Sequence, residues 1–139
     1  MDQERIMEES MEKILEYLEQ KKYFMVRDEM LKFNEADIAE MFEELFDNED
    51  ELEKAVVVYR LLPKDVSVEV FSLLPVDDQL KIVEGINPKE LNYIVQELDF
   101  DDKIDILEEL PANVVDKILE KTPKDERKLI NTFLNYPDD

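Results

Sequence analysis

The chain has 139 residues, a typical single-domain length, and 44% of them are hydrophobic, which is enough to build a core. It contains 38 Asp and Glu but only 17 Lys and Arg, which gives a formal net charge of −21. A nucleic-acid partner is therefore not expected, because phosphate backbones are bound by clustered cations. The chain has no Cys, no His and one Gly, so it lacks a thiol, an imidazole and a glycine-rich phosphate loop. An enzyme built from this chain would have to use carboxylates alone for catalysis, and we expect the protein not to be an enzyme.

No segment has the character of a membrane span or a signal peptide. The longest uninterrupted apolar run, Ala55 to Tyr59, is far shorter than the roughly 20 residues that a spanning helix requires. The first residues lack the basic start and the apolar stretch of a signal peptide. We therefore expect a soluble, intracellular segment that does not itself insert into a membrane.

The first 60 residues predict four helices. Apolar residues recur at helical spacing near the N-terminus, at Met7, Met11, Ile14, Leu15 and Leu18. A second helix is expected over about 23–32. A third should begin at Asn34, which can cap its first turn, with Asp37 placed near the positive end of the helix dipole. Residues 55–59 have strand propensity, yet the apolar spacing from 52 to 62 is helical and predicts a buried helix.

From residue 61 onward the chain carries an internal repeat of about 12 residues. Its mark is proline, at Pro63, Pro75, Pro88, Pro111, Pro123 and Pro137, with Phe100 standing where one proline is missing. We expect a helix to start at six of these positions, 63, 75, 88, 100, 111 and 123, because a proline at the first residue of a helix loses no hydrogen bond by its missing N–H. Seven residues later an aliphatic residue recurs and should be buried: Val70, Ile82, Val95, Leu107, Ile118 and Ile130.

This pattern predicts an all-α fold of about ten short helices, stacked as a right-handed superhelix of the armadillo-like or solenoid type. Helices this short are marginal alone and need neighbours on which to bury their apolar faces. We assign residues 1–135 to one helical domain, with its first helices in 1–60 and its proline-initiated repeats in 61–135. Residues 136–139 are assigned to the start of a linker.

Several motifs resemble the N-terminal cytosolic domain of the MgtE magnesium transporters. They are Leu-Leu-Pro-Lys at 61–64 with Glu-Val at 69–70, Leu-Leu-Pro at 73–75, Glu-Leu-Asp-Phe-Asp-Asp at 97–102 and Tyr-Pro-Asp-Asp at 136–139. In that family a helical superhelix precedes a pair of CBS domains and a dimeric transmembrane pore. The resemblance implies one domain of a longer, homodimeric membrane protein, on the cytoplasmic side of the membrane, with the CBS and membrane domains as its partners.

The resemblance also implies a function. Such a domain senses cytosolic Mg²⁺ and closes the pore when the ion bridges it to the neighbouring CBS domain. The residues at the matching positions are Glu69, Asp101 and Asp105. Because the neighbouring domain would complete the sites, the isolated chain should bind Mg²⁺ only weakly.

The residues themselves support this reading less strongly. Asp101 and Asp105 are four apart on a predicted helix, so their carboxylates share one face, and carboxylate oxygens suit Mg²⁺. In so acidic a chain, however, such pairs also arise by chance. A related helical repeat occurs in the flagellar motor switch protein FliG, so a protein-interaction scaffold is the alternative function.

Overall fold

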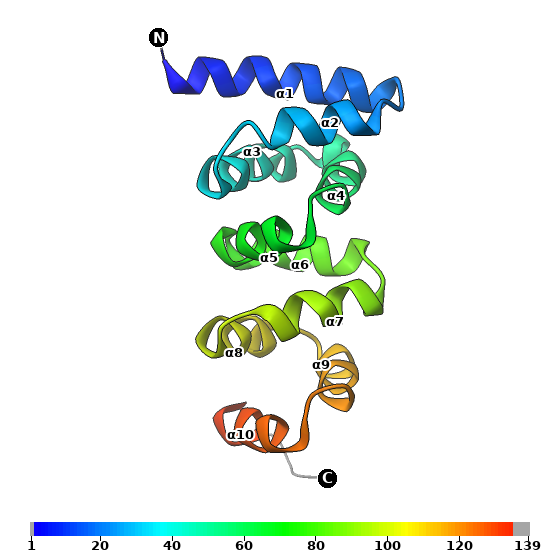
Figure 1. The fold of residues 1–139 in the computed structure, drawn as a ribbon. Helices are drawn as coiled ribbons and strands as arrows, with labels where there is room; N and C mark the ends of the chain where they lie inside the picture. The colour runs from blue at the N-terminus through cyan, green and yellow to red at the C-terminus, as the bar shows by residue number, and fades with distance from the viewer. Residues whose placement is uncertain (1, 135–139) are drawn as a thin grey trace. The chain divides into compact units, whose positions relative to one another are not determined.

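The structure, a computed structural model, describes residues 2–134, and all regular elements in that range are helices. They comprise one short 3₁₀ helix and ten α-helices, which confirms the predicted fold class (Figure 1). In chain order these are α1 (Gln3–Glu19), α2 (Tyr23–Met30), α3 (Glu35–Asp47), η1 (Glu49–Glu51), α4 (Leu52–Arg60), α5 (Lys64–Leu73), α6 (Val76–Gly85), α7 (Pro88–Glu97), α8 (Phe100–Glu109), α9 (Ala112–Glu120) and α10 (Lys124–Leu134).

The chain divides into two compact units, Met1–Gly85 and Ile86–Asp139. The first unit contains α1 to α6 and the second contains α7 to α10. The right-handed superhelix therefore stays a prediction. The linker assigned to residues 136–139 lies outside the described residues.

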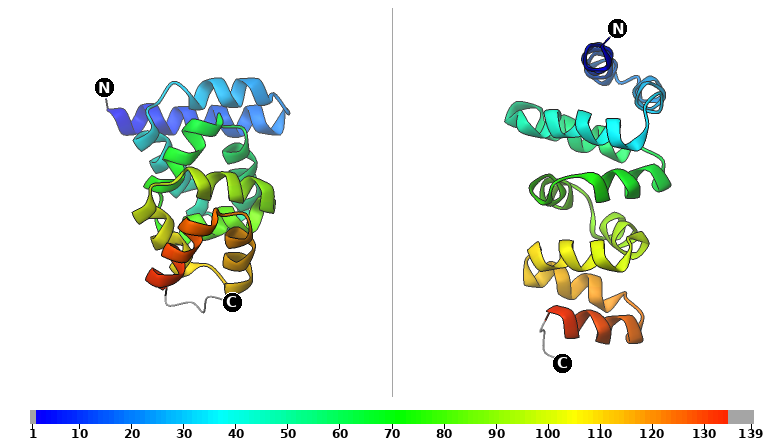
Figure 2. Two further views of the ribbon diagram at one scale, coloured as in Figure 1. Left: turned by 60° about the horizontal axis from the view of Figure 1, so that its bottom comes forward. Right: turned by 90° about the vertical axis from the view of Figure 1, so that its left-hand side faces the viewer.

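In the first unit, α1 and α2 form an antiparallel hairpin that packs through α1 on α4 (Figure 2). The next helix begins as the sequence predicts, because the side chain of Asn34 accepts a hydrogen bond of 2.9 Å from the backbone N–H of Asp37. Helix α3 then contacts α4, α5 and α6 and supplies much of the buried apolar surface of this unit.

Aromatic rings from α3 and α4 lie at the centre of this core. The ring of Phe42 stacks on that of Phe46 at 6.0 Å and meets the edge of Tyr59 at 5.8 Å. The buried hydroxyl of Tyr59 donates a hydrogen bond of 2.8 Å to the carbonyl of Ser67. Residues 55–59 thus form a buried helix rather than a strand, since tertiary burial outweighs their β propensity.

The predicted first helical residue is right for α7, at Pro88, and for α8, at Phe100, and wrong by one residue for α5, α6, α9 and α10, each of which begins directly after its proline. Pro63 and Pro111 are N-cap residues, with ψ angles of 149° and 147° that are extended rather than helical. Pro88 is the first helical residue because Asn87 precedes it and accepts a 2.8 Å hydrogen bond from the N–H of Glu90. A proline ring presets φ for either position, so the repeat alone does not distinguish them.

The aliphatic anchors of the repeat are all buried, as predicted. Their exposed fractions are 0% for Val70, Ile82, Val95, Leu107 and Ile130 and 3% for Ile118. A shift of one residue in where a helix begins leaves these positions on its inner face, because the anchors keep their spacing from one another.

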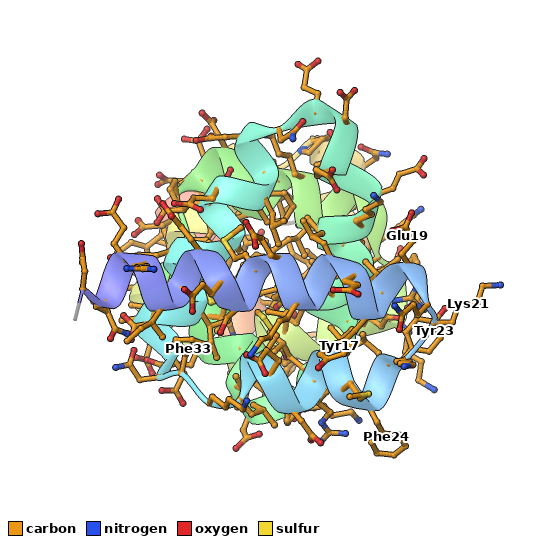
Figure 3. The ribbon with its side chains drawn as sticks, turned by 90° about the horizontal axis from the view of Figure 1, so that it is seen from above. Tyr17, Glu19, Lys21, Tyr23, Phe24 and Phe33 are labelled. Atoms are coloured by element: carbon orange, nitrogen blue, oxygen red, sulfur yellow. The ribbon has the colours of Figure 1, made fainter. Side chains whose placement is uncertain are left out.

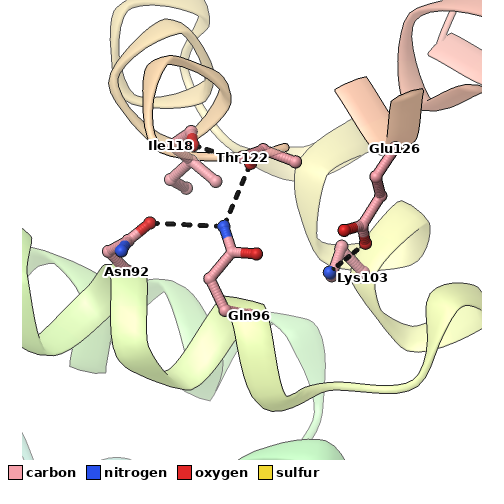
Figure 4. A network of polar contacts seen from close by, with 6 residues as sticks. All are labelled: Asn92, Gln96, Lys103, Ile118, Thr122 and Glu126. Atoms are coloured by element: carbon pink, nitrogen blue, oxygen red, sulfur yellow. Dashed lines mark hydrogen bonds and ion pairs between the residues drawn. The ribbon is translucent and has the colours of Figure 1, made fainter. Parts of the chain in front are cut away.

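In the second unit, α7 packs on α9 and α8 packs on α10. The amide of Gln96 donates to the hydroxyl of Thr122 at 3.0 Å, and that hydroxyl donates to the carbonyl of Ile118 at 2.8 Å (Figure 4). The buried ammonium of Lys103 on α8 pairs with Glu126 on α10 (Figure 4). The first contacts join α7 to the end of α9, and the ion pair joins α8 to α10.

The single glycine of the chain is required by close packing and not by a special backbone conformation. A Cβ at Gly85 would lie 2.8 Å from both methyl groups of Val56, which is too close.

We expect Gly85→Ala to destabilise the first unit by about 1–2 kcal/mol, because the stiff, branched valine cannot turn away. Chemical denaturation measures this loss. In a Val56→Ala background the same change should cost nothing, and an equal cost in both backgrounds would contradict the steric reason.

Candidate functional site

The paired aspartates lie on α8, which begins directly after Asp99. The carbonyl of Asp99 accepts the first helical hydrogen bond, 2.9 Å from the N–H of Lys103. The inner face of α8 is buried, and the outer face carries Asp101 and Asp105, both exposed. The apolar side of the helix thus sets which way the two carboxylates point.

Asp101 and Asp105 stand one helical turn apart, with their side chains on the same face. Within the described part of the chain, neither carboxylate takes part in a side-chain hydrogen bond or an ion pair. Two like charges about 6 Å apart repel by roughly 0.7 kcal/mol in water, and a divalent cation between them removes that cost. The pair therefore offers oxygen ligands that no side chain of the described residues already occupies.

Glu69 and the aspartate pair lie in different compact units of the chain. Glu69 lies exposed on α5 of the first unit, whereas Asp101 and Asp105 belong to the second. Among residues 2–134 the structure contains no group of three or more acidic side chains that could hold a metal ion. The structure thus places Glu69 in one compact unit and the aspartate pair in the other.

A buried acidic residue that the sequence did not reveal lies in the first unit. Asp78 on α6 is buried, and burial raises the pKa of its carboxyl although Lys81 acts in the opposite direction. Glu43 on α3 also has a raised pKa, because of burial and of the negative charges of Asp78, Glu40 and Asp47. Asp78 stands beside Asp77 in the first turn of α6, and no sequence signal distinguishes the buried acid from its exposed neighbour.

The raised pKa values predict that the protein becomes more stable on mild acidification. An unfolded Asp78 would titrate near 3.8 and an unfolded Glu43 near 4.5, so above those values the folded chain holds protons that the unfolded chain has lost. Lowering the pH from neutrality toward those values should therefore raise the melting temperature. Asp78→Asn should raise the melting temperature at neutral pH and reduce its pH dependence. Glu12→Gln, an exposed control, should do neither, and an unchanged pH profile in Asp78→Asn would contradict the assignment.

The pKa of Glu29 on α2 is shifted in the opposite direction, below its ordinary value. Burial raises its pKa, but the hydrogen bonds from Lys32 and Ser10, both 2.8 Å long, outweigh burial and keep the pKa below its ordinary value. This ion pair stabilises the fold at neutral pH and is lost only as the pH falls through that lowered pKa. Glu29 and Lys32 line a polar groove of about 470 Å³ between α1, α2 and the start of α3. Since every polar atom of Glu29 has a partner, we assign this group a structural role.

No helix within residues 2–134 has the length and apolar character needed to cross a bilayer. A search of curated proteins finds no match to this chain. A family comparison matches residues 33–139, from the start of α3 onward, to the family described as the MgtE intracellular N domain. The match covers most of the chain and includes Glu69, Asp101 and Asp105. The chain therefore belongs to the MgtE intracellular N domain family, a family of magnesium-transporter domains rather than of enzymes.

Proposed function

We propose that this chain is the cytosolic Mg²⁺-sensing domain of a magnesium transporter or channel, and that it closes the pore when Mg²⁺ bridges it to a neighbouring CBS domain. The observation that carries the proposal is the family match over residues 33–139. It is supported by the exposed carboxylates of Asp101 and Asp105, which have no ion-pair partner among the described residues.

The chemistry of these side chains fits Mg²⁺. This small, hard cation takes oxygen ligands, usually one or two carboxylates, and keeps several water molecules. Asp101 and Asp105 supply that number, and Glu69 supplies one carboxylate to a second site on the first unit. Further ligands would come from water and from the adjoining domain. Such sites are weak in the isolated chain and become stronger when the two domains meet.

Electrostatic repulsion between acidic domains explains how Mg²⁺ would control docking. A domain with a net charge of −21 is repelled by another acidic surface, and the repulsion weakens when cations lie between them. A ligand shifts a conformational equilibrium only through its different affinity for the two states. A site completed across two domains provides that difference, so rising cytosolic Mg²⁺ favours the docked, closed state.

The experiment that tests this proposal is done in the full-length transporter. Replacing Asp101 and Asp105 with Asn removes two anionic ligands from the closed state, so more Mg²⁺ should be needed to close the pore and to protect the domain linker from protease. If each carboxylate contributes about 1.4 kcal/mol, the required Mg²⁺ rises about a hundredfold for the pair. The matched control is Glu8→Gln with Glu12→Gln, an exposed pair with the same spacing on α1, outside the matched region.

The two possible shifts separate bridging from simple charge repulsion. If repulsion alone governs docking, the Asp101 and Asp105 variant should close at lower Mg²⁺, because neutralisation relieves that repulsion. A shift to lower Mg²⁺, or no shift, would contradict bridging. The helical-scaffold alternative is tested by the downstream sequence, where a pair of CBS domains and a set of apolar helices favour the transporter.

A further inference from the structure

A cationic, aromatic surface lies at the end of the α1–α2 hairpin (Figure 3). It consists of Lys21, Lys22, Tyr23, Phe24 and Arg27, all exposed, and we call it the hairpin patch. Phe24 is 79% exposed and Tyr23 is 44% exposed. Figure 3 shows Phe24 on the outer side of α2 and Lys21 projecting beyond the turn. Most of the Phe24 ring, and a large part of Tyr23, is therefore open to solvent.

The charge of the hairpin patch is opposite to that of the chain. Residues 20–27 contain Lys21, Lys22 and Arg27 and no acidic residue, although the chain as a whole carries −21. Glu19 and Asp28 border the segment. Within residues 2–134 none of the three cations takes part in an ion pair, whereas other lysines do, among them Lys32, Lys54, Lys81 and Lys103. The patch thus offers unpaired positive charge beside exposed rings.

The backbone supplies an independent observation. Lys21 has a φ of 60°, and it is the one residue other than glycine with positive φ among the described residues. The turn is a Schellman motif, in which the N–H of Lys21 donates to the carbonyl of Leu18 at 3.0 Å and that of Lys22 to the carbonyl of Tyr17 at 2.8 Å. Glycine is the residue that this position favours. A lysine held there against the backbone preference indicates a use for its charge.

We propose that the hairpin patch docks the domain on an anionic membrane surface. Cations beside exposed aromatic rings suit the headgroup region, where the rings enter the interface and the lysines reach anionic lipids. The inference rests on the proposed function only in that a transporter domain has a bilayer within reach. We favour a membrane over a second copy of this chain, since a symmetric contact would set these cations against each other.

The test measures binding of the 139-residue chain to vesicles by sedimentation, at about 0.15 M salt, where charges beyond about 8 Å are screened. Vesicles of phosphatidylcholine containing phosphatidylglycerol should bind the chain, and vesicles of phosphatidylcholine alone should bind it at least tenfold more weakly. Equal binding to both vesicles, or binding to neither, would overturn the proposal. Because no Mg²⁺ is present, failure here leaves the Mg²⁺-dependent closing of the pore untouched.

Three variants locate the contact. Phe24→Ser and the pair Lys22→Gln with Arg27→Gln should each weaken binding about tenfold or more, since each removes one class of contact. Lys21→Gly should weaken binding while raising the melting temperature, because glycine relieves the backbone. Weaker binding in a more stable protein cannot be attributed to unfolding. Unchanged binding in all three variants would contradict the assignment.

The controls carry the same chemical changes at other exposed positions. Leu73→Ser removes an apolar side chain that is 48% exposed, and Lys117→Gln with Lys121→Gln removes two exposed cations one helical turn apart. Both controls should bind vesicles like the unmodified chain, and a loss as large as that of the patch variants would show unspecific attraction. Concentration-dependent self-association that Phe24→Ser abolishes, with no vesicle binding, would identify a second copy as the partner and overturn the membrane assignment.

Discussion

Leu107→Asp is expected to cost more than about 4 kcal/mol and to unfold the second unit at ordinary temperature. Leu107 is 0% exposed on the inner face of α8, and it is one of the aliphatic anchors of the repeat. An aspartate at this position would remove the buried apolar side chain of the leucine and would place an unpaired negative charge in the core. The loss of helical signal in circular dichroism, followed against temperature, measures the effect.

The matched control uses a leucine of the same unit that faces solvent. Leu129 on α10 is 50% exposed, so Leu129→Asp adds the same charge without burying it and should change stability by less than about 1 kcal/mol. Equal losses in the two variants would show that added negative charge is the cause. Wild-type stability in Leu107→Asp would show that the inner face of α8 is assigned wrongly.

The second large effect is expected at the buried ion pair of the second unit. The side chain of Lys103 is 3% exposed, and that of its partner Glu126 is 32% exposed. Glu126→Ala would leave a buried ammonium unpaired, and we expect a loss of about 3–5 kcal/mol. Lys103→Met should cost less, because the remaining carboxylate can be hydrated. The free energy of unfolding from denaturant titration gives both values.

Two further variants separate the buried charge from other effects. Asp125→Ala removes an exposed acid from the same first turn of α10 and should cost only the small helix-dipole contribution, below about 1 kcal/mol. The double variant Lys103→Met with Glu126→Ala should regain most of the loss of Glu126→Ala, because no unpaired charge remains. If the two single losses simply add, the ion pair does not account for them.

The sequence determined the class of fold and the inner face of the repeated helices. Apolar spacing decides which side of a helix must leave water, so Val70, Leu107 and Ile130 could be placed in the core from their positions alone. The cap at Asn34 was equally local, since it needs only a side-chain acceptor beside the free amides of the next turn. Asp101 and Asp105 could be placed on one face for the same reason.

Tertiary structure alone decided which charged residues are buried. Asp78, Glu29 and Lys103 are embedded in their units, yet each stands in a stretch whose composition is shared by many exposed acids and lysines. Whether such a group is buried depends on which helix packs over it, and that neighbour comes from elsewhere in the chain, as Glu126 does for Lys103. The closeness of Gly85 to Val56 and the positive φ of Lys21 are decided in the same way, because packing and chain reversal between helices overrule local preference.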